Sequence, residues 1–446
     1  MSLSTGLEVR KQIIKFLVSY KFQHFDKVFN QFFPDNYFAN IKYSILFSLK
    51  NYIRNYLLIN YYFKSLIKKP DKLPDIIIHI IKFGLFQLSF QTKIPDYSII
   101  NESVELTKIF KISGLSKLVN GVLRNFLKEK EALDKKLNEN NLKNISIKYS
   151  FPEWLIKRWE KQFQKNELLK LLEFYNQMDF KISICILFNK ENFLKQLDEN
   201  KINYFTSDYF NEIIYLESTK EIINNPKISE NQYIIIDESS ILPIYFFNFQ
   251  KPEKYNFLEV GAFPGGKSVL INSKIPDNCE LYLIDKNPEK KEKFLYNQKR
   301  YSIKYKELII NDFLKTEFKI KFEKILIDSP CSALGTIRKN PEIKLNRQNS
   351  DIQKIATLQY ELLEKGINIL KEGGELVYSI CSFEKEETKE VIKRLLSKNK
   401  NIELSEENNL PEMLKEKLVY NSGYYCYPFK TEIPGFFIAK IIKKNN

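Results

Sequence analysis

The stretch FLEVGAFPGGKSVLI, residues 257–271, decides the fold that this sequence predicts. Its first residues read as a buried strand, a glycine-rich turn follows, and apolar residues from Val269 onward indicate a helix. A strand that enters a helix through a tight glycine turn leaves free backbone N–H groups at the helix start, where they can hold a carboxylate or phosphate. We therefore expect a ligand site at this turn, with a purely structural turn as the alternative.

Short apolar runs recur after this point, and helical patterns separate them. The runs are NFLEVGAF (256–263), CELYLIDK (279–286), KELIINDF (306–313), EKILIDSP (323–330) and GELVYSIC (374–381). Continuous apolar strands that alternate with helices predict a doubly wound parallel sheet. We expect this α/β fold over residues 233–446.

The first half of the chain predicts two further domains, which suits its length. Apolar residues at helical spacing indicate an all-α domain over residues 1–138, whose end is the charged, asparagine-rich segment 130–144. Residues 139–232 mix helices with short strands, which predicts a small α+β domain of RRM or ferredoxin-like type. Its expected elements are strands over 181–188 and 212–218 and a helix over 190–199, and a further strand over 232–240 leads into the α/β region.

Composition excludes several classes of protein. The longest apolar stretch, residues 76–90, is interrupted by His79, Lys82 and Gly84, so it predicts a core helix and not a membrane span. The N-terminus has no apolar signal core, so we expect a cytoplasmic protein, and we expect a monomer without a membrane partner. Two histidines and five cysteines without a CxxC pair argue against a metal site and favour reduced thiols.

Positive charge indicates a polyanionic partner. The chain has 70 basic and 55 acidic residues, a formal net charge of +15, although coding bias toward lysine is an alternative cause. Only eight basic residues are arginines, which are the planar, bidentate donors. Arg338, Lys339, Lys344 and Arg347 form a basic run that predicts contacts with an RNA backbone, a solvated face being the alternative. Arg124 is expected either to add RNA affinity or to form a structural ion pair.

The glycine turn also narrows the choice of ligand. Its GxxxGG pattern fits neither the dinucleotide fingerprint GxGxxG nor a Walker phosphate loop. About twenty residues on, a strand ends at Asp285, where a carboxylate can bind ribose hydroxyls. An adenosine-bearing ligand without a polyphosphate fits best, so S-adenosylmethionine is the expected cofactor.

Two cysteines stand at the ends of predicted strands. KILIDSPCSALGTIRKNPEIK (324–344) places Asp328 and Cys331 just past one strand, and VYSICSFEKEE (377–387) ends another at Cys381. The carboxyl ends of parallel strands share one edge of a sheet, where ligands bind. Two of five cysteines at that edge suggest reactive thiols, with small buried residues as the alternative.

These motifs resemble those of the RNA 5-methylcytosine methyltransferases. DSPCSALGTIRKNPEIK (328–344) is similar to their DAPCSGTGxxRRxPDIK, YSICSFEKEE (378–387) to Y(S/A)TCSxxPEEN, and FLEVGAFPGGKS (257–268) to LDLCAAPGGKT. Residues 82–108 and 118–126 resemble the bacterial 16S rRNA cytosine-C5 methyltransferases of the RsmB/NOP family. The resemblance covers nearly the whole chain. It implies a NusB-like RNA-binding domain over 1–138 and a Rossmann-like methyltransferase domain over 233–446.

The resemblance also implies an activity, which is methylation of C5 of a 16S rRNA cytosine, free or within a small-subunit assembly intermediate. Cys381 would be the nucleophile that attacks C6, and Cys331 would assist product release. Asp328 would contact the cytosine edge, with Lys267 close to the reacting centre. The residues expected to bind the cofactor are Gly261, Ala262, Phe263, Pro264, Gly265, Gly266, Lys267, Asp285, Asp312 and Asp328.

The sequence departs from the family pattern at several positions. Gly261 and Phe263 replace a usual Cys and Ala in the turn, and Glu259 replaces Asp. The bulk of Phe263 is therefore expected to reshape the cofactor pocket. Two alternatives stay open: a different RNA target, such as tRNA or another rRNA, and a non-catalytic RNA-binding assembly factor. The intact Cys331 and Cys381 argue against the second.

Overall fold

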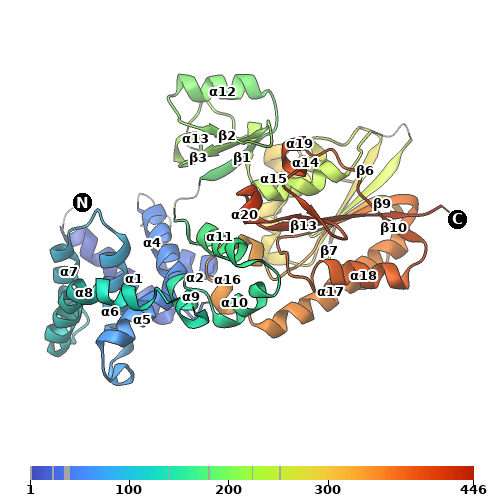
Figure 1. Ribbon diagram of the computed structural model, residues 1–446. Coiled ribbons are helices and arrows are strands. Elements are labelled where there is room, and N and C mark those ends of the chain that lie inside the picture. The colour runs from blue at the N-terminus through green and yellow to red at the C-terminus, as the bar shows by residue number, and fades with distance from the viewer. Residues whose placement is uncertain are drawn as a thin grey trace. The chain divides into compact units, whose positions relative to one another are not determined.

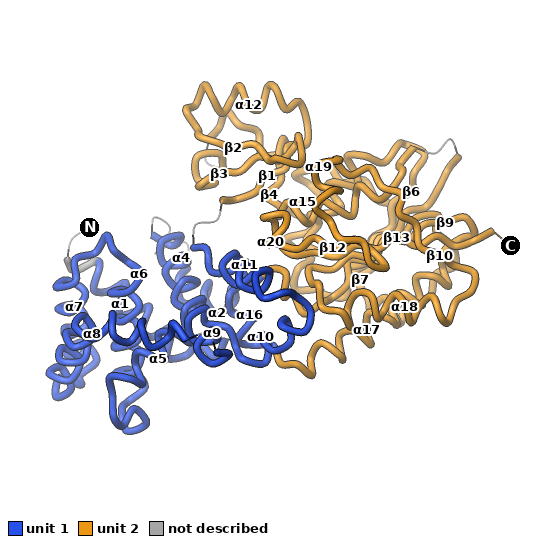
Figure 2. The backbone as a smooth tube through the Cα atoms, in the orientation of Figure 1, with its two compact units in different colours: residues 1–178, 337–347 blue, residues 179–336, 348–446 orange. Residues whose placement is uncertain are grey.

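The structure, a computed structural model, divides the chain into two compact units (Figure 2). It describes residues 3–22, 25–34, 41–139, 141–178, 181–223, 225–250 and 253–445. Unit 1 comprises residues 1–178 and 337–347, and unit 2 comprises residues 179–336 and 348–446. This division differs from the expected three domains, because residues 139–178 continue the helical unit and the small sheet groups with the larger one.

Unit 1 is built of helices, as the N-terminal sequence predicted. They are α1 (Leu3–Ser19), α2 (Phe25–Phe32), α4 (Lys42–Arg54), α5 (Tyr56–Leu66), α6 (Asp75–Phe90), α7 (Asp96–Ile109), α8 (Ser116–Lys136), α9 (Leu142–Lys148), α10 (Glu153–Glu160), α11 (Lys165–Asn176) and α16 (Ile343–Asn346), with short 3-10 turns η1 (Pro70–Lys72) and η2 (Ser113–Leu115). Helix α6 contains the apolar stretch 76–90. Within the described ranges, no helix is both long enough and apolar enough to cross a membrane.

Helix α6 shows why unit 1 folds as it does. Ile77, Ile81 and Leu85 are completely buried at helical spacing. At Gly84 a Cβ atom would lie 2.9 Å from Cδ2 of Leu123 on α8, so the absence of a side chain allows the two helices to approach closely. Aromatic side chains of α1 and α2, including Phe16, belong to the same core.

The small sheet of unit 2 is antiparallel, with the order β2-β3-β1-β4. Its elements are β1 (Ile182–Ile186), α12 (Lys190–Glu199), β2 (Phe205–Thr206), β3 (Ile213–Leu216), α13 (Lys220–Ile223), η3 (Glu230–Gln232) and β4 (Tyr233–Ile235). Ile184 and Ile214 face the α12 side, whereas Cys185 and Ile213 join the main core of unit 2. The strand expected over 232–240 ends at Ile235, because the next residues turn into a 3-10 helix, η4 (Glu238–Phe246).

The larger sheet has the order β11-β12-β13-β9-β8-β5-β6-β7, and β10 pairs with β13. The strands are β5 (Tyr255–Val260), β6 (Cys279–Asp285), β7 (Glu307–Ile310), β8 (Phe322–Asp328), β9 (Leu370–Ile380), β10 (Ile402–Ser405), β11 (Val419–Tyr420), β12 (Tyr424–Cys426) and β13 (Phe436–Lys443). Strands β5 to β9 pair in parallel, and the C-terminal strands add antiparallel pairs. The predicted α/β class with a parallel sheet is confirmed.

Helices cover both faces of this sheet. Figure 1 shows α17 and α18 on one face and α14 and α15 on the other. The helices and turns are α14 (Gly266–Asn272), η5 (Pro288–Lys290), α15 (Lys291–Tyr301), η6 (Phe313–Lys315), η7 (Leu334–Thr336), α17 (Asn349–Ile369), α18 (Lys389–Lys398), α19 (Glu412–Lys415) and α20 (Pro428–Thr431). After β5 the chain runs outward through β6 and β7 and then returns to the other side of β5 as β8. This reversal creates a crevice at the carboxyl ends of β5 and β8, where open α/β sheets bind ligands.

Candidate active site

A cavity of about 370 Å³ lies in unit 2 at the carboxyl ends of β5, β6, β8 and β9. Its lining residues are Val260, Gly261, Phe263, Ile284, Asp285, Lys286, Asn287, Lys290, Asn311, Asp312, Phe313, Asp328, Ser329, Pro330, Cys331, Ala333, Leu358, Leu362 and Cys381. Both predicted cysteines and three predicted acids are among them. The ends of parallel strands therefore bring together residues that are up to 121 positions apart in the sequence, from Val260 to Cys381.

The turn after β5 has the backbone shape that only glycine adopts readily. Gly261 has φ of 85°, and a Cβ atom there would lie 2.5 Å from the carbonyl oxygen of Asp328. Gly265 has φ of 103° and precedes α14. Phe263 lines the cavity and packs on Phe294, with ring centroids 4.9 Å apart. The departure at Phe263 thus places an aromatic ring in the cavity wall.

Asp285, at the end of β6, stabilises this turn through a hydrogen bond to its backbone. Its Oδ2 accepts a hydrogen bond of 2.9 Å from the backbone N–H of Phe263, and its Oδ1 accepts one of 2.8 Å from that of Asn287. Each carboxylate oxygen has a second acceptor position. Asp285 can therefore still accept hydrogen bonds from the hydroxyls of a ribose in the cavity.

The two cysteines lie next to each other at the cavity. Cys381 follows β9, Cys331 follows β8, and their sulfur atoms are 3.0 Å apart. The pKa of Cys331 is raised well above its usual value, first by the hydrogen bond with Cys381 and then by burial. Cys331 is therefore held as a neutral thiol at neutral pH, and it can exchange a proton with its neighbour.

A partly buried ion pair lies beside the thiols. Lys267 Nζ donates to Oδ2 of Asp328 at 2.6 Å, and Ser379 Oγ donates to Oδ1 at 3.2 Å. Burial acts to lower the pKa of Lys267, but the hydrogen bond and charge of Asp328 outweigh it, so the pKa is raised. Lys267 consequently stays protonated and serves as a donor, not as a base.

Comparison with known sequences shows the family to which the chain belongs. The sequence model described as 16S rRNA methyltransferase RsmB/F matches residues 246–442, and the NusB family model matches residues 8–128. The chain is 30% identical over 371 residues to the ribosomal RNA small subunit methyltransferase B of Escherichia coli O1:K1 / APEC, which covers 82% of each chain. The chain belongs to the 16S rRNA methyltransferase RsmB/F family.

Solved structures support the fold of this RsmB/F-family protein. The crystal structure of PH0851 covers 98% of both chains with a TM-score of 0.74 at 20% identity. That of NSun6 from Pyrococcus horikoshii with SFG, an S-adenosylmethionine analogue, covers 66% of this chain and 99% of that one, with a TM-score of 0.56 at 19% identity. Family membership makes the protein an rRNA methyltransferase that uses S-adenosylmethionine.

The cavity of the RsmB/F-family chain fits this cofactor. Gly261, Phe263, Asp285, Asp312 and Asp328 line it, and three of these five residues offer carboxylates as acceptors for the hydroxyl and amino groups of the cofactor. The other turn residues predicted as cofactor contacts do not line the cavity; they are Ala262, Pro264, Gly265, Gly266 and Lys267. Ala262 is 2% exposed and belongs to the hydrophobic core, so its side chain supports the turn from behind.

The basic run predicted to bind RNA belongs to unit 1. Lys344 is completely buried: its Nζ donates to the carbonyl of Arg54 at 2.8 Å and lies 4.0 Å from the ring centroid of Phe151. In this conformation Lys344 cannot reach an RNA phosphate, which corrects the prediction for that residue. Lys339 is exposed, and so is Arg124 on α8, where its Nε donates to Asn120.

Several residues that line the cavity were not predicted from the sequence. Lys286 and Asn287 directly follow the predicted Asp285, so their position past a strand end was a usable signal. Leu358 and Leu362 come from α17, and nothing local in that helix indicated a cavity wall. The carboxylate of Glu387 was also missed; its oxygens accept hydrogen bonds from Ser332 and Ser382, the residues that follow the two cysteines.

Proposed function

We propose that this protein methylates C5 of a cytosine in 16S rRNA, with Cys381 as the covalent nucleophile and Cys331 assisting product release. The observation that carries the proposal is the pair of thiols, 3.0 Å apart, at the wall of the cofactor cavity. A reaction at a nitrogen or oxygen atom needs no such pair, because those atoms already carry a lone pair for the methyl group.

Carbon C5 of cytosine is a weak nucleophile, and addition to C6 activates it. The Cys381 thiolate forms an S–C6 bond, and the electron pair of the C5–C6 double bond becomes available at C5. Bound S-adenosylmethionine supplies the methyl group that C5 accepts. A base then removes the C5 proton, the double bond forms again, and the S–C6 bond breaks to release Cys381 as a thiolate.

The neighbours of the thiols have matching roles in this scheme. Asp328 contacts the N3/N4 edge of the cytosine, which favours electron flow into the ring during attack. Lys267 neutralises and orients Asp328 through their 2.6 Å contact. Cys331, held as a thiol by its raised pKa, is available for proton transfer during release.

RNA contacts outside the cavity are part of the proposal. Four basic residues of unit 1 are proposed to contact the RNA backbone and so to position the target: Arg124 on α8, Arg338, Lys339 and Arg347. The protein is proposed to act as a monomer, on 16S rRNA or on a small-subunit assembly intermediate. Asp312 is proposed to lie near the adenine of the cofactor.

The test is transfer of radiolabelled methyl groups from S-adenosylmethionine to 16S rRNA, followed by nucleoside analysis. The wild-type protein should yield 5-methylcytosine, and Cys381→Ala should lower the rate at least 1,000-fold, because the covalent step is lost. Cys279→Ala is the matched control, since Cys279 lies at the start of β6, outside the cavity. Full activity of Cys381→Ala would refute the assignment of Cys381 as the nucleophile. Methylation of tRNA but not of 16S rRNA would make tRNA the substrate instead.

A further inference from the structure

A single buried carboxylate joins the loops that follow the two cysteines. Glu387 lies in the turn between β9 and α18, and its side chain is completely buried. Its Oε1 accepts from the backbone N–H of Ser332 at 2.7 Å, and its Oε2 accepts from the hydroxyls of Ser332 at 2.5 Å and Ser382 at 2.7 Å. Ser332 directly follows Cys331, and Ser382 directly follows Cys381.

Glu387 and the residues that donate hydrogen bonds to it are called the clamp below. Helix α17 supplies its fourth donor. Gln359 Nε2 donates to Oε1 of Glu387 at 3.1 Å and to the carbonyl of Pro330 at 2.9 Å. Gln359, Ser332 and Ser382 are all completely buried. The carboxylate thus has four donors within a region closed to water, and their hydrogen bonds offset the cost of its burial.

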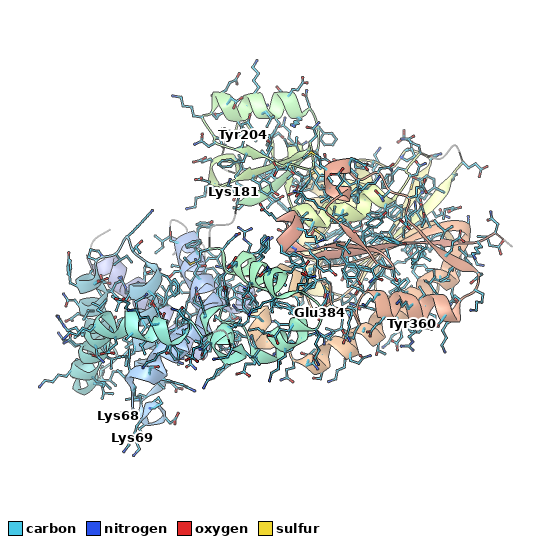
Figure 3. The ribbon with its side chains drawn as sticks, in the orientation of Figure 1. Lys68, Lys69, Lys181, Tyr204, Tyr360 and Glu384 are labelled. Atoms are coloured by element: carbon cyan, nitrogen blue, oxygen red, sulfur yellow. The ribbon has the colours of Figure 1, made fainter. Side chains whose placement is uncertain are left out.

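Backbone contacts also connect the two loops that follow Cys331 and Cys381. Gly335 N–H donates to the carbonyl of Cys381 at 3.0 Å, and a Cβ atom at Gly335 would lie 2.9 Å from that oxygen. Within the turn after Cys381, the N–H of Glu384 (labelled in Figure 3) donates to Ser382 Oγ at 3.3 Å. The backbones on either side of the thiols therefore have little freedom to separate once the clamp is in place.

We propose that Glu387 is a positioning residue, which holds the sulfur atoms of Cys331 and Cys381 at contact distance so that release follows methyl transfer. This inference rests on the proposed covalent mechanism. Glu387 does not line the cavity, so it acts through the loops and not on the substrate. Its negative charge also contributes to the raised pKa of Cys331, after the hydrogen bond with Cys381, burial and the charge of Cys381.

Two substitutions of Glu387 separate shape from charge. In Glu387→Gln, the amide oxygen can accept from Ser332 N–H and Gln359, while its NH₂ donates to the two serine hydroxyls, which turn to accept. The clamp is kept, and kcat should stay within about tenfold of wild type. In Glu387→Ala the four donors lose their acceptor, and kcat should fall about 100-fold, as expected when reacting groups shift by about 1 Å.

The spacing itself is measured with dibromobimane, which becomes fluorescent after it links two nearby thiols. Wild type and Glu387→Gln should form the Cys331–Cys381 link, identified by peptide mass, and Glu387→Ala should lose most of it. The KM for rRNA and the Kd for S-adenosylmethionine should stay within twofold in all variants. Glu390→Ala is the matched control, because Glu390 is exposed and its carboxylate pairs with the exposed Lys385.

Each outcome decides the inference. Unchanged kcat or unchanged cross-linking in Glu387→Ala would overturn it. Loss of S-adenosylmethionine binding in that variant would also overturn it, because Glu387 would then support the fold in general. If the wild-type protein makes no 5-methylcytosine, the proposed function fails first, whereas the cross-linking result still reports on the clamp.

Discussion

At the scale of the residue, Glu259 is an ionisable group buried beside the active site. Its side chain lies within β5, is 1% exposed, and accepts a hydrogen bond of 2.6 Å from Ser268 Oγ. Burial raises its pKa from 4.5 to about 8, although the hydrogen bond from Ser268 and the charge of Lys267 oppose the shift. The folded protein therefore keeps a proton on Glu259 at pH values where the unfolded chain has lost it.

This proton links stability to pH. Between about pH 4.5 and pH 8 the folded state binds one more proton than the unfolded state, so the free energy of unfolding falls as the pH rises, by about 1 kcal/mol per pH unit from this group. Glu259→Gln should remove that share of the slope. Urea unfolding of the full chain at several pH values across this window measures it, with Glu307→Gln on the exposed part of β7 as control. Parallel slopes for wild type and Glu259→Gln would contradict this account.

The gathering of the predicted site residues at one cavity was predictable for one physical reason. Asp285 and Asp328 end parallel strands and Cys381 directly follows one, and parallel strands end at a common edge. Glu387 was not predictable from residue type, because a glutamate in an acidic, helix-starting run is usually solvated. Only the packing of α17 and the two loops shows its burial.

At the scale of the element, periodic segments were predicted well. The helix expected over 190–199 is α12, with the same bounds, and the strand expected over 181–188 contains β1. Strands β2 and β11 have two residues each, too few to show an alternation, and sequence reasoning did not find them. The strand expected over 232–240 was too long, because its last four residues are polar and the 3-10 helix η4 already begins at Glu238.

At the scale of the whole molecule, the chain leaves the catalytic unit for eleven residues and then returns to it. Residues 337–347, which come soon after Cys331, belong to unit 1, where Leu345 packs against the helical core. Sequence reasoning assigned them to the catalytic domain, because neighbours in a sequence usually fold together. The burial of Lys344 against Phe151 depends on residues almost two hundred positions away, which no local pattern reveals.

Hydrogen exchange tests this assignment. Lys344→Ala removes the donor to the carbonyl of Arg54 and leaves a cavity beside Phe151, so unit 1 should lose about 2 kcal/mol of stability. Exchange should become faster in α4 and α5, while β8 and β9 keep their protection. Lys339→Ala, at an exposed neighbour, is the control. Faster exchange confined to β8 and β9 would place the segment with the catalytic sheet instead.

The proposed function depends on a covalent bond between Cys381 and cytosine, and the variant Cys331→Ala should make that bond visible. This variant should form the adduct but release it slowly, so a protein–RNA complex should accumulate on a denaturing gel with 16S rRNA and S-adenosylmethionine. After digestion with ribonuclease and protease, tandem mass spectrometry locates the modified residue. The account predicts a methylated cytidine nucleotide on the peptide that contains Cys381. A nucleotide on any other residue, or no adduct at all, would contradict it.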